Sequence, residues 1–90
     1  KYNIKIHKII LFGSRARGDY NEYSDWDILI VTEEKLEWKI EKKILGELIG
    51  KFAKEYLDMD ILITDKEEFD KKKKDIGYVY YWADKEGIII

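Results

Sequence analysis

The sequence predicts one α/β domain, because segments typical of strands and segments typical of helices alternate along its 90 residues. Short apolar runs rich in Ile and Leu are the first observation, and a long stretch with an apolar residue at every fourth position is the second. The third is the length, since 90 residues hold one modest core. We therefore expect a single domain over residues 1–90. Its first residue is Lys1 rather than Met, which predicts that a few N-terminal residues of the natural protein precede it.

The first third of the chain is predicted to form two strands joined by a polar turn. Ile4–Phe12 is rich in branched apolar residues and stops at Gly13, as a buried strand does. Residues 13–24 are polar and contain two glycines, which predicts a turn that can hold a short helix. Asp25–Val31 is the second predicted strand, and its side chains alternate between the two faces of the sheet.

A long amphipathic helix and a third strand are predicted next. Thr32 can cap the helix, which should run to about Tyr56 and bury one apolar stripe. Leu57–Thr64 alternates again and predicts the third strand. The members of the helical stripe that recur four residues apart are Leu36, Ile40, Ile44, Leu48 and Phe52.

The last third of the chain is predicted to hold shorter elements. Asp65 and Glu68 resemble a capping box, which predicts a further helical turn. Ile76–Lys85 has apolar residues at helical spacing, although its aromatic cluster would also suit a strand. Gly87 can end that helix, and Ile88–Ile90 predicts a short last strand.

The composition excludes several classes of function. The 17 Lys+Arg and 19 Asp+Glu give a formal net charge of -2, so no basic face for nucleic acid is expected. No apolar run is long enough to cross a membrane. Cysteine is absent, which excludes disulfides and thiolate metal sites and favours a reducing, cytoplasmic location.

The turn between the first two strands carries groups that can bind phosphate. Gly13 lets the chain turn sharply at little steric cost. Backbone N–H groups of the next turn, together with the Ser14 hydroxyl, can cradle an anion. Ser14 could also act as a helix N-cap, and the two roles are compatible.

A pair of carboxylates begins the second strand. Asp25 and Asp27 share one face, because strand side chains alternate with a period of two. They repel each other unless a proton or a cation joins them. Mg²⁺ suits such a site, since it takes one or two carboxylates plus substrate phosphates. Asp60, early on the third strand, is the preferred third carboxylate, and Asp58 on the same face is its rival.

This arrangement resembles the signature of the minimal nucleotidyltransferases, a family of the DNA polymerase β nucleotidyltransferase superfamily. The signature is Gly-Ser, ten residues, then Asp-x-Asp, which here is Gly13, Ser14, Asp25 and Asp27. Other parts of the sequence are also similar to the family. They are Arg15–Asp19, which follows the Gly-Ser pair, Ser24 before the first Asp, the Met59–Ile63 strand and the ending Glu86-Gly87-Ile88.

The resemblance implies a fold and a reaction. The fold is the nucleotidyltransferase fold, a mixed β-sheet flanked by helices, and the reaction moves a nucleoside monophosphate from an NTP to a hydroxyl. Asp25 and Asp27 would bind two Mg²⁺ ions, while Asp60 would bind one of them and help to deprotonate the acceptor. Gly13 and Ser14 would hold the β- and γ-phosphates. Two such metals can stabilise both the attacking and the leaving oxygen.

The two arginines of the chain, Arg15 and Arg17, have two possible roles. They could steady the phosphates of the nucleotide. Their planar guanidinium forks could equally pair with Asp19 or Glu22. Tyr20 in the same loop could stack on a base, and local packing is the simpler expectation.

The resemblance also implies a partner. Small standalone members resemble the antitoxin half of two-gene modules whose toxin is a HEPN-domain ribonuclease. Such an antitoxin transfers AMP from ATP to a tyrosine of the toxin. Two alternatives remain: a non-catalytic antitoxin that occludes its partner, and nucleotidyl transfer to a small-molecule hydroxyl such as that of an aminoglycoside. A homo-oligomer is compatible with each of these functions.

Overall fold

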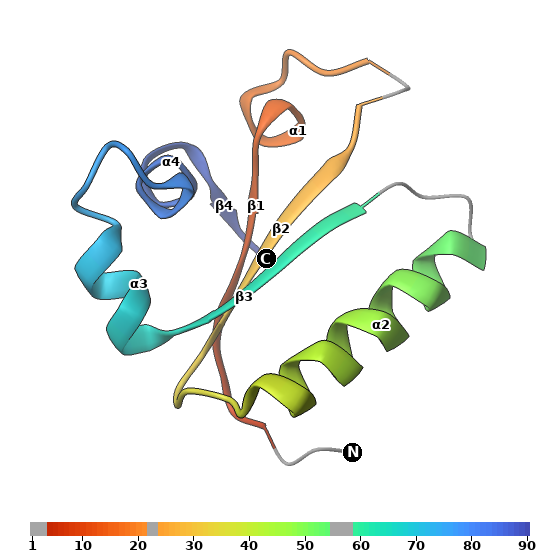
Figure 1. Ribbon diagram of the computed structural model, residues 1–90. Coiled ribbons are helices and arrows are strands. Elements are labelled where there is room, and N and C mark those ends of the chain that lie inside the picture. The colour runs from red at the N-terminus through yellow and green to blue at the C-terminus, as the bar shows by residue number, and fades with distance from the viewer. Residues whose placement is uncertain (1–3, 22–23, 55–58) are drawn as a thin grey trace.

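The computed structural model describes residues 4–21, 24–54 and 59–90, and in them a four-stranded sheet carries helices on both faces (Figure 1). This confirms the predicted α/β class with a mixed sheet flanked by helices. No helix within these ranges combines the length and the apolar composition that a bilayer span requires. The elements in chain order are β1 (Ile6–Phe12), α1 (Ser14–Arg17), β2 (Trp26–Thr32), α2 (Trp38–Lys54), β3 (Met59–Asp65), α3 (Lys66–Lys72), α4 (Val79–Glu86) and β4 (Ile88–Ile89).

The strands lie in the order β3-β2-β1-β4. β1 runs antiparallel to both β2 and β4, whereas β2 and β3 are parallel. A parallel pair needs a crossover connection, and α2 supplies it between β2 and β3. As a result, the end of β1 and the beginnings of β2 and β3 meet at one edge of the sheet.

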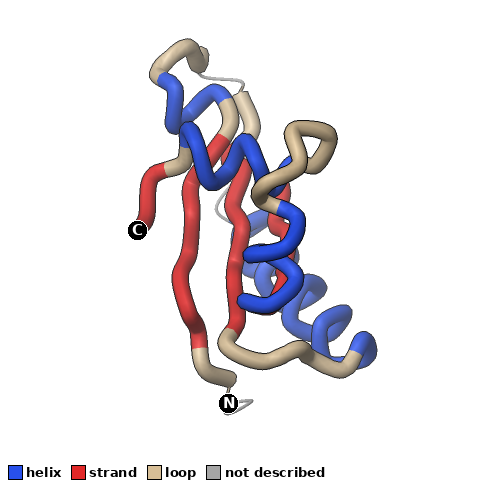
Figure 2. Tube along the Cα trace, turned by 90° about the vertical axis from the view of Figure 1, so that its left-hand side faces the viewer, coloured by secondary structure: helices blue, strands red, loops and turns tan. Residues whose placement is uncertain are grey.

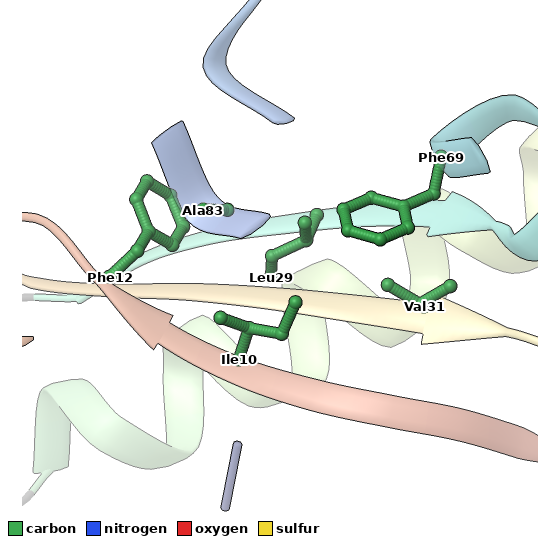
Figure 3. Close-up of a cluster of buried hydrophobic side chains, with 6 residues drawn as sticks. All are labelled: Ile10, Phe12, Leu29, Val31, Phe69 and Ala83. Atoms are coloured by element: carbon green, nitrogen blue, oxygen red, sulfur yellow. The ribbon is translucent and has the colours of Figure 1, made fainter. Parts of the chain in front are cut away.

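The main core lies on the face of the sheet that α3 and α4 cover (Figure 3). Leu29 and Val31 of β2 are fully buried there, as the predicted alternation requires. Tyr80 packs against this cluster, with its ring centroid 6.1 Å from that of Phe69. The face that Asp25 and Asp27 share with Leu29 is therefore the α3/α4 face. The buried cluster consists of Ile10, Phe12, Leu29, Val31, Phe69 and Ala83.

Helix α2 covers the opposite face more loosely. Figure 2, seen from the α3/α4 side, shows α2 behind the strands. The predicted apolar stripe does face the sheet, but its side chains are only half-buried, and no α2 residue is completely buried. A groove of about 500 Å³ separates α2 from the sheet, and its apolar lining includes Ile30, Leu48 and Ile63.

Thr32 does not cap the long helix, so this prediction is wrong. It is the buried last residue of β2, and α2 begins only at Trp38. The Thr32 hydroxyl lies 2.7 Å from the carbonyl oxygen of Glu34 and 3.2 Å from that of Thr64 on β3. The hydroxyl thus serves a contact between strands, which a local capping pattern does not reveal.

The predicted third strand is confirmed as β3, which extends one residue further, to Asp65. The expected helix end near Tyr56, and the first expected strand residues Leu57 and Asp58, lie outside the described residues. β1 is also confirmed, starting at Ile6 with an irregular register between Ile6 and Lys8.

The element types predicted for the last third of the chain are confirmed, but the helix expected over Ile76–Lys85 begins only at Val79 and the last strand ends at Ile89. The Asp65 carboxylate accepts a hydrogen bond from the Glu68 backbone N–H at 3.1 Å and caps α3. The aromatic segment forms helix α4 rather than a strand, since helical spacing turns Tyr80 and Ala83 toward the core. The Gly87 N–H donates to the Ala83 carbonyl at 2.9 Å and ends the helix before β4.

Candidate functional site

Strand pairing brings three separate parts of the chain to one edge of the sheet. In the antiparallel register Phe12 at the end of β1 is opposite Asp27. In the parallel register Asp27 is opposite Asp60 near the start of β3. Paired residues project to the same face, so the two carboxylates are neighbours on the α3/α4 face. Figure 1 shows this edge at the top of the sheet, where α1 also lies.

Gly13 lies directly against Asp27. Its backbone has φ +75° and ψ −159°, a conformation that is essentially restricted to glycine. A Cβ atom at this position would overlap the carboxylate of Asp27. The close approach of loop and strand therefore depends on glycine, and it places the start of the candidate phosphate loop beside the carboxylate pair.

Negative charge outweighs positive charge around Asp27. Burial raises the pKa of Asp27 above its ordinary value, and the negative charges of Asp60 and then Asp25 raise it further. The positive charge of Arg17 acts in the opposite direction and is the smallest of these effects on the Asp27 pKa. A proton or a cation would relieve this repulsion, which is what a carboxylate site for a divalent metal requires.

Asp25 and Asp60 flank Asp27 and are exposed. Asp58, the rival third carboxylate, lies outside the described residues. Within the described part of the chain, no three His, Cys, Asp or Glu side chains converge closely enough to hold a metal by themselves. The donor chemistry still fits Mg²⁺, because this ion is usually bound by one or two carboxylates and completed by phosphate oxygens and water.

Ser14 is the first residue of α1, and Gly13 rather than Ser14 occupies the N-cap position. The Gly13 carbonyl accepts the backbone N–H groups of Ala16 and Arg17, each at 3.1 Å. No side chain makes a cap hydrogen bond at this end of α1. The half-buried Ser14 hydroxyl is thus not used as an N-cap, and its role in phosphate binding stays a prediction.

The two arginines have different surroundings. Arg15 donates two hydrogen bonds to the Ser24 carbonyl. Tyr20 packs locally, with its ring against the Arg15 guanidinium, as the simpler expectation had it. Arg17 pairs with Asp19 at 3.3 Å and lies 3.8 Å from Glu86 of α4. The pairing of Arg17 with Asp19 was one of its two predicted roles, and Glu22 lies outside the described residues.

Sequence reasoning missed residues of α4 that border the loop. Val79, Trp82 and Glu86 line an open pocket of about 400 Å³ together with Gly13 and Arg17. Their spacing of three and four residues places them on one side of the helix, and that spacing was the available signal. Trp82 is exposed, so its ring is accessible at this pocket.

This geometry agrees with the comparison to known families. A model of the nucleotidyltransferase domain family matches residues 1–78, most of the chain. The match includes the Gly13 loop, Asp25 just before β2, Asp27 of β2 and Asp60 of β3. The chain belongs to the nucleotidyltransferase domain family.

Individual relatives have names that are more specific than the description of the family. Two proteins of Methanocaldococcus jannaschii, each named "Putative protein adenylyltransferase", are 42% identical to this chain over 72 residues and 48% identical over 61 residues. The matches cover 80% and 67% of this chain. They cover 67% and 57% of the two relatives, so this chain corresponds to part of their length.

Proposed function

We propose that the chain is a divalent-metal-dependent protein adenylyltransferase that moves AMP from ATP to a hydroxyl of a partner protein. The observation that carries this proposal is the direct pairing of Asp27 with Asp60 beside the close approach of Gly13. The names of the relatives support adenylyl transfer to protein as the type of reaction.

Asp25, Asp27 and Asp60 are the residues that would hold Mg²⁺, two ions in the proposed complex with ATP. The raised pKa of Asp27 supports this, because the site has an excess of negative charge that cations would balance. When bound, the metal would neutralise charge that develops on the phosphate oxygens. Gly13, Ser14 and Arg17 are proposed to hold the β- and γ-phosphates.

The transfer step is a substitution at the α-phosphorus of ATP. The acceptor hydroxyl oxygen forms a bond to this phosphorus, and the bond from the phosphorus to the bridging oxygen of the β-phosphate breaks. Pyrophosphate leaves, and the hydroxyl proton passes to Asp60. The exposure of the Asp60 side chain leaves it open to an incoming acceptor.

The proposed acceptor is a tyrosine of a HEPN-domain toxin, and the modification would inactivate the toxin. The resemblance to standalone minimal nucleotidyltransferases supports this partner. The antitoxin role thus rests on catalysis rather than on occlusion of the toxin.

We expect a neighbouring gene to encode a HEPN-domain protein, and mass spectrometry of that protein tests the proposal. Incubation with this protein, ATP and Mg²⁺ should add one or more AMP groups to tyrosine, and Asp27→Asn should abolish the addition. Asp70→Asn is the matched control, because Asp70 is on α3, which follows the far end of β3. If Asp27→Asn neutralised the toxin as well as the wild type does, occlusion would replace catalysis. Labelling of small-molecule hydroxyls alone would also contradict the proposal.

A further inference from the structure

The Arg15 side chain is bound to the backbone immediately before the carboxylate strand. Its Nη2 and Nε atoms lie 3.0 Å and 3.3 Å from the carbonyl oxygen of Ser24. Ser24 directly precedes Asp25, and its own N–H donates to the Asn21 carbonyl at 3.1 Å. Two donors of one guanidinium thus converge on one carbonyl oxygen and hold this segment against the Arg15 side chain.

Two aromatic rings hold the same guanidinium. The Arg15 Cζ atom is 4.6 Å from the centroid of the Tyr20 ring and 4.4 Å from that of Trp26. Planar guanidinium groups stack on aromatic faces in a way that a lysine ammonium does not. Arg15 thereby links α1, the loop that follows it and the first residue of β2.

The contacts of Arg15 lie on the face of β2 opposite the carboxylates. Trp26 projects to the face opposite Asp25 and Asp27, because side chains alternate along β2. Arg17, by contrast, is the cation that lowers the pKa of Asp27, and it lies near Glu86 of α4. It is therefore on the same face of the sheet as Asp27. Arg15 and Arg17 are thus two residues apart in sequence but act from different sides of the strand.

We propose that Arg15 is a positioning residue, which sets the place of Asp25 and Asp27 relative to the Gly13 loop and does not contact the phosphates itself. This proposal rests on the proposed function, because the placement of Asp25 and Asp27 affects catalysis only if they hold the metal for AMP transfer. A misplacement of about 1 Å at a catalytic group can cost about 100-fold in rate. The contribution of Arg15 is therefore to kcat and metal binding rather than to affinity for the triphosphate.

Arg15→Lys and Arg17→Lys form a matched pair of variants, because each keeps its positive charge and loses the planar fork. For Arg15→Lys we expect kcat to fall about 10- to 100-fold with the KM for ATP nearly unchanged. Binding of Mn²⁺ should weaken, while binding of tripolyphosphate should stay as in the wild type. For Arg17→Lys we expect the reverse pattern, with weaker tripolyphosphate binding and a higher KM.

Hydrogen exchange gives a readout that does not depend on activity. The N–H groups of Arg17 and Gly18, which bond to Gly13 and Ser14, should exchange faster in Arg15→Lys than in the wild type. Tyr20→Ala removes one ring from an exposed position and should shift exchange in the same direction by less. Tyr20→Phe keeps the ring and should exchange like the wild type.

Two results would overturn the positioning role. One is an Arg15→Lys variant with weakened tripolyphosphate binding and unchanged Mn²⁺ binding, since that pattern means direct phosphate contact. The other is unchanged exchange in α1 for both Arg15→Lys and Tyr20→Ala. Failure of the proposed function would look different, because the wild type would then transfer no AMP while the exchange experiment still reports on the Arg15 link.

Discussion

Gly13 leaves the space that the Asp27 carboxylate occupies. Its positive φ and its contact with Asp27 are separate requirements for glycine, one from the backbone and one from the neighbour. Gly18 has a positive φ as well, +88°, but among the described residues nothing apart from its own neighbours in the chain lies within 4 Å of the place where its Cβ would be. The two glycines therefore allow strain and contact to be measured separately.

Gly13→Ala should disable the site, whereas Gly18→Ala should only destabilise the fold. We expect each to cost about 1–3 kcal/mol of unfolding free energy from backbone strain. Gly13→Ala should in addition displace Asp27 and lower AMP transfer about 100-fold. Urea unfolding and transfer assays of both variants make the comparison. Equal AMP transfer by the Gly13→Ala and Gly18→Ala variants would contradict a role in catalysis for the contact of Gly13 with Asp27.

Asp27→Asn should stabilise the metal-free protein at neutral pH. The folded state raises the pKa of Asp27 above its unfolded value, so protonation favours the folded state. This contribution is fully present below the unfolded pKa of 3.8 and is lost as the pH rises through the raised folded value. Thermal unfolding from pH 3 to pH 8 should therefore show the Tm advantage of Asp27→Asn growing with pH.

Excess Mg²⁺ should reverse that order, because only the wild-type carboxylate pair gains from the cation. An Asp27→Asn variant that is less stable than the metal-free wild type at pH 7 would contradict the assigned repulsion among the carboxylates.

Residue patterns predicted that Gly13, Asp27 and Asp60 lie together, and their roles stay a prediction. Gly13 and Asp27 are recognisable because a turn, a strand and a two-residue alternation are all local features. The link from Arg15 to Ser24 was not predicted, since it depends on how the loop returns to β2. The pocket beside Trp82 depends on the packing of α4 over β1, and short sequence patterns contain no information on that packing.

At the scale of the elements, periodicity predicted the strands and the long helices. The predicted ends of several elements differ from the observed ones. β3 follows from alternation, and α3 follows from the predicted Asp65 cap, although the Glu68 carboxylate accepts from the Thr64 hydroxyl. The predicted start of α2 was wrong, because the buried Thr32 hydroxyl is directed at the carbonyl oxygens of Glu34 and of Thr64 on β3 instead of at a helix N–H. Tertiary hydrogen bonding thus overrode local propensity at that position.

The two faces of the sheet should contribute unequally to stability. Leu29→Ala removes a fully buried side chain from the α3/α4 face and should cost about 2–5 kcal/mol of unfolding free energy. Leu48→Ala makes the same chemical change on α2, where the side chain is half-buried beside the groove, and should cost less than half as much. Urea denaturation compares them, and equal losses would show that α2 is packed as tightly as the core.

At the scale of the whole molecule, the order β3-β2-β1-β4 collects the functional groups at one edge. The core lies further along the same α3/α4 face, and α1 lies at the end of β1 beside this edge (Figure 1). The fold thus holds Asp27 and Asp60 on strands and the candidate phosphate-binding residues at Gly13 and on the short helix α1. This division allows rigid placement of the former and close approach of the latter.

The origin of the transferred group tests the central claim most directly. ATP labelled at the α-phosphate and ATP labelled at the γ-phosphate should each be incubated with this chain, Mg²⁺ and the proposed HEPN-domain acceptor. We predict that only the α-label enters the acceptor, that one pyrophosphate is released for each group added, and that Asp27→Asn abolishes both. Transfer of the γ-label, or release of phosphate without any labelled acceptor, would contradict nucleotidyl transfer at the Gly13, Asp27 and Asp60 site.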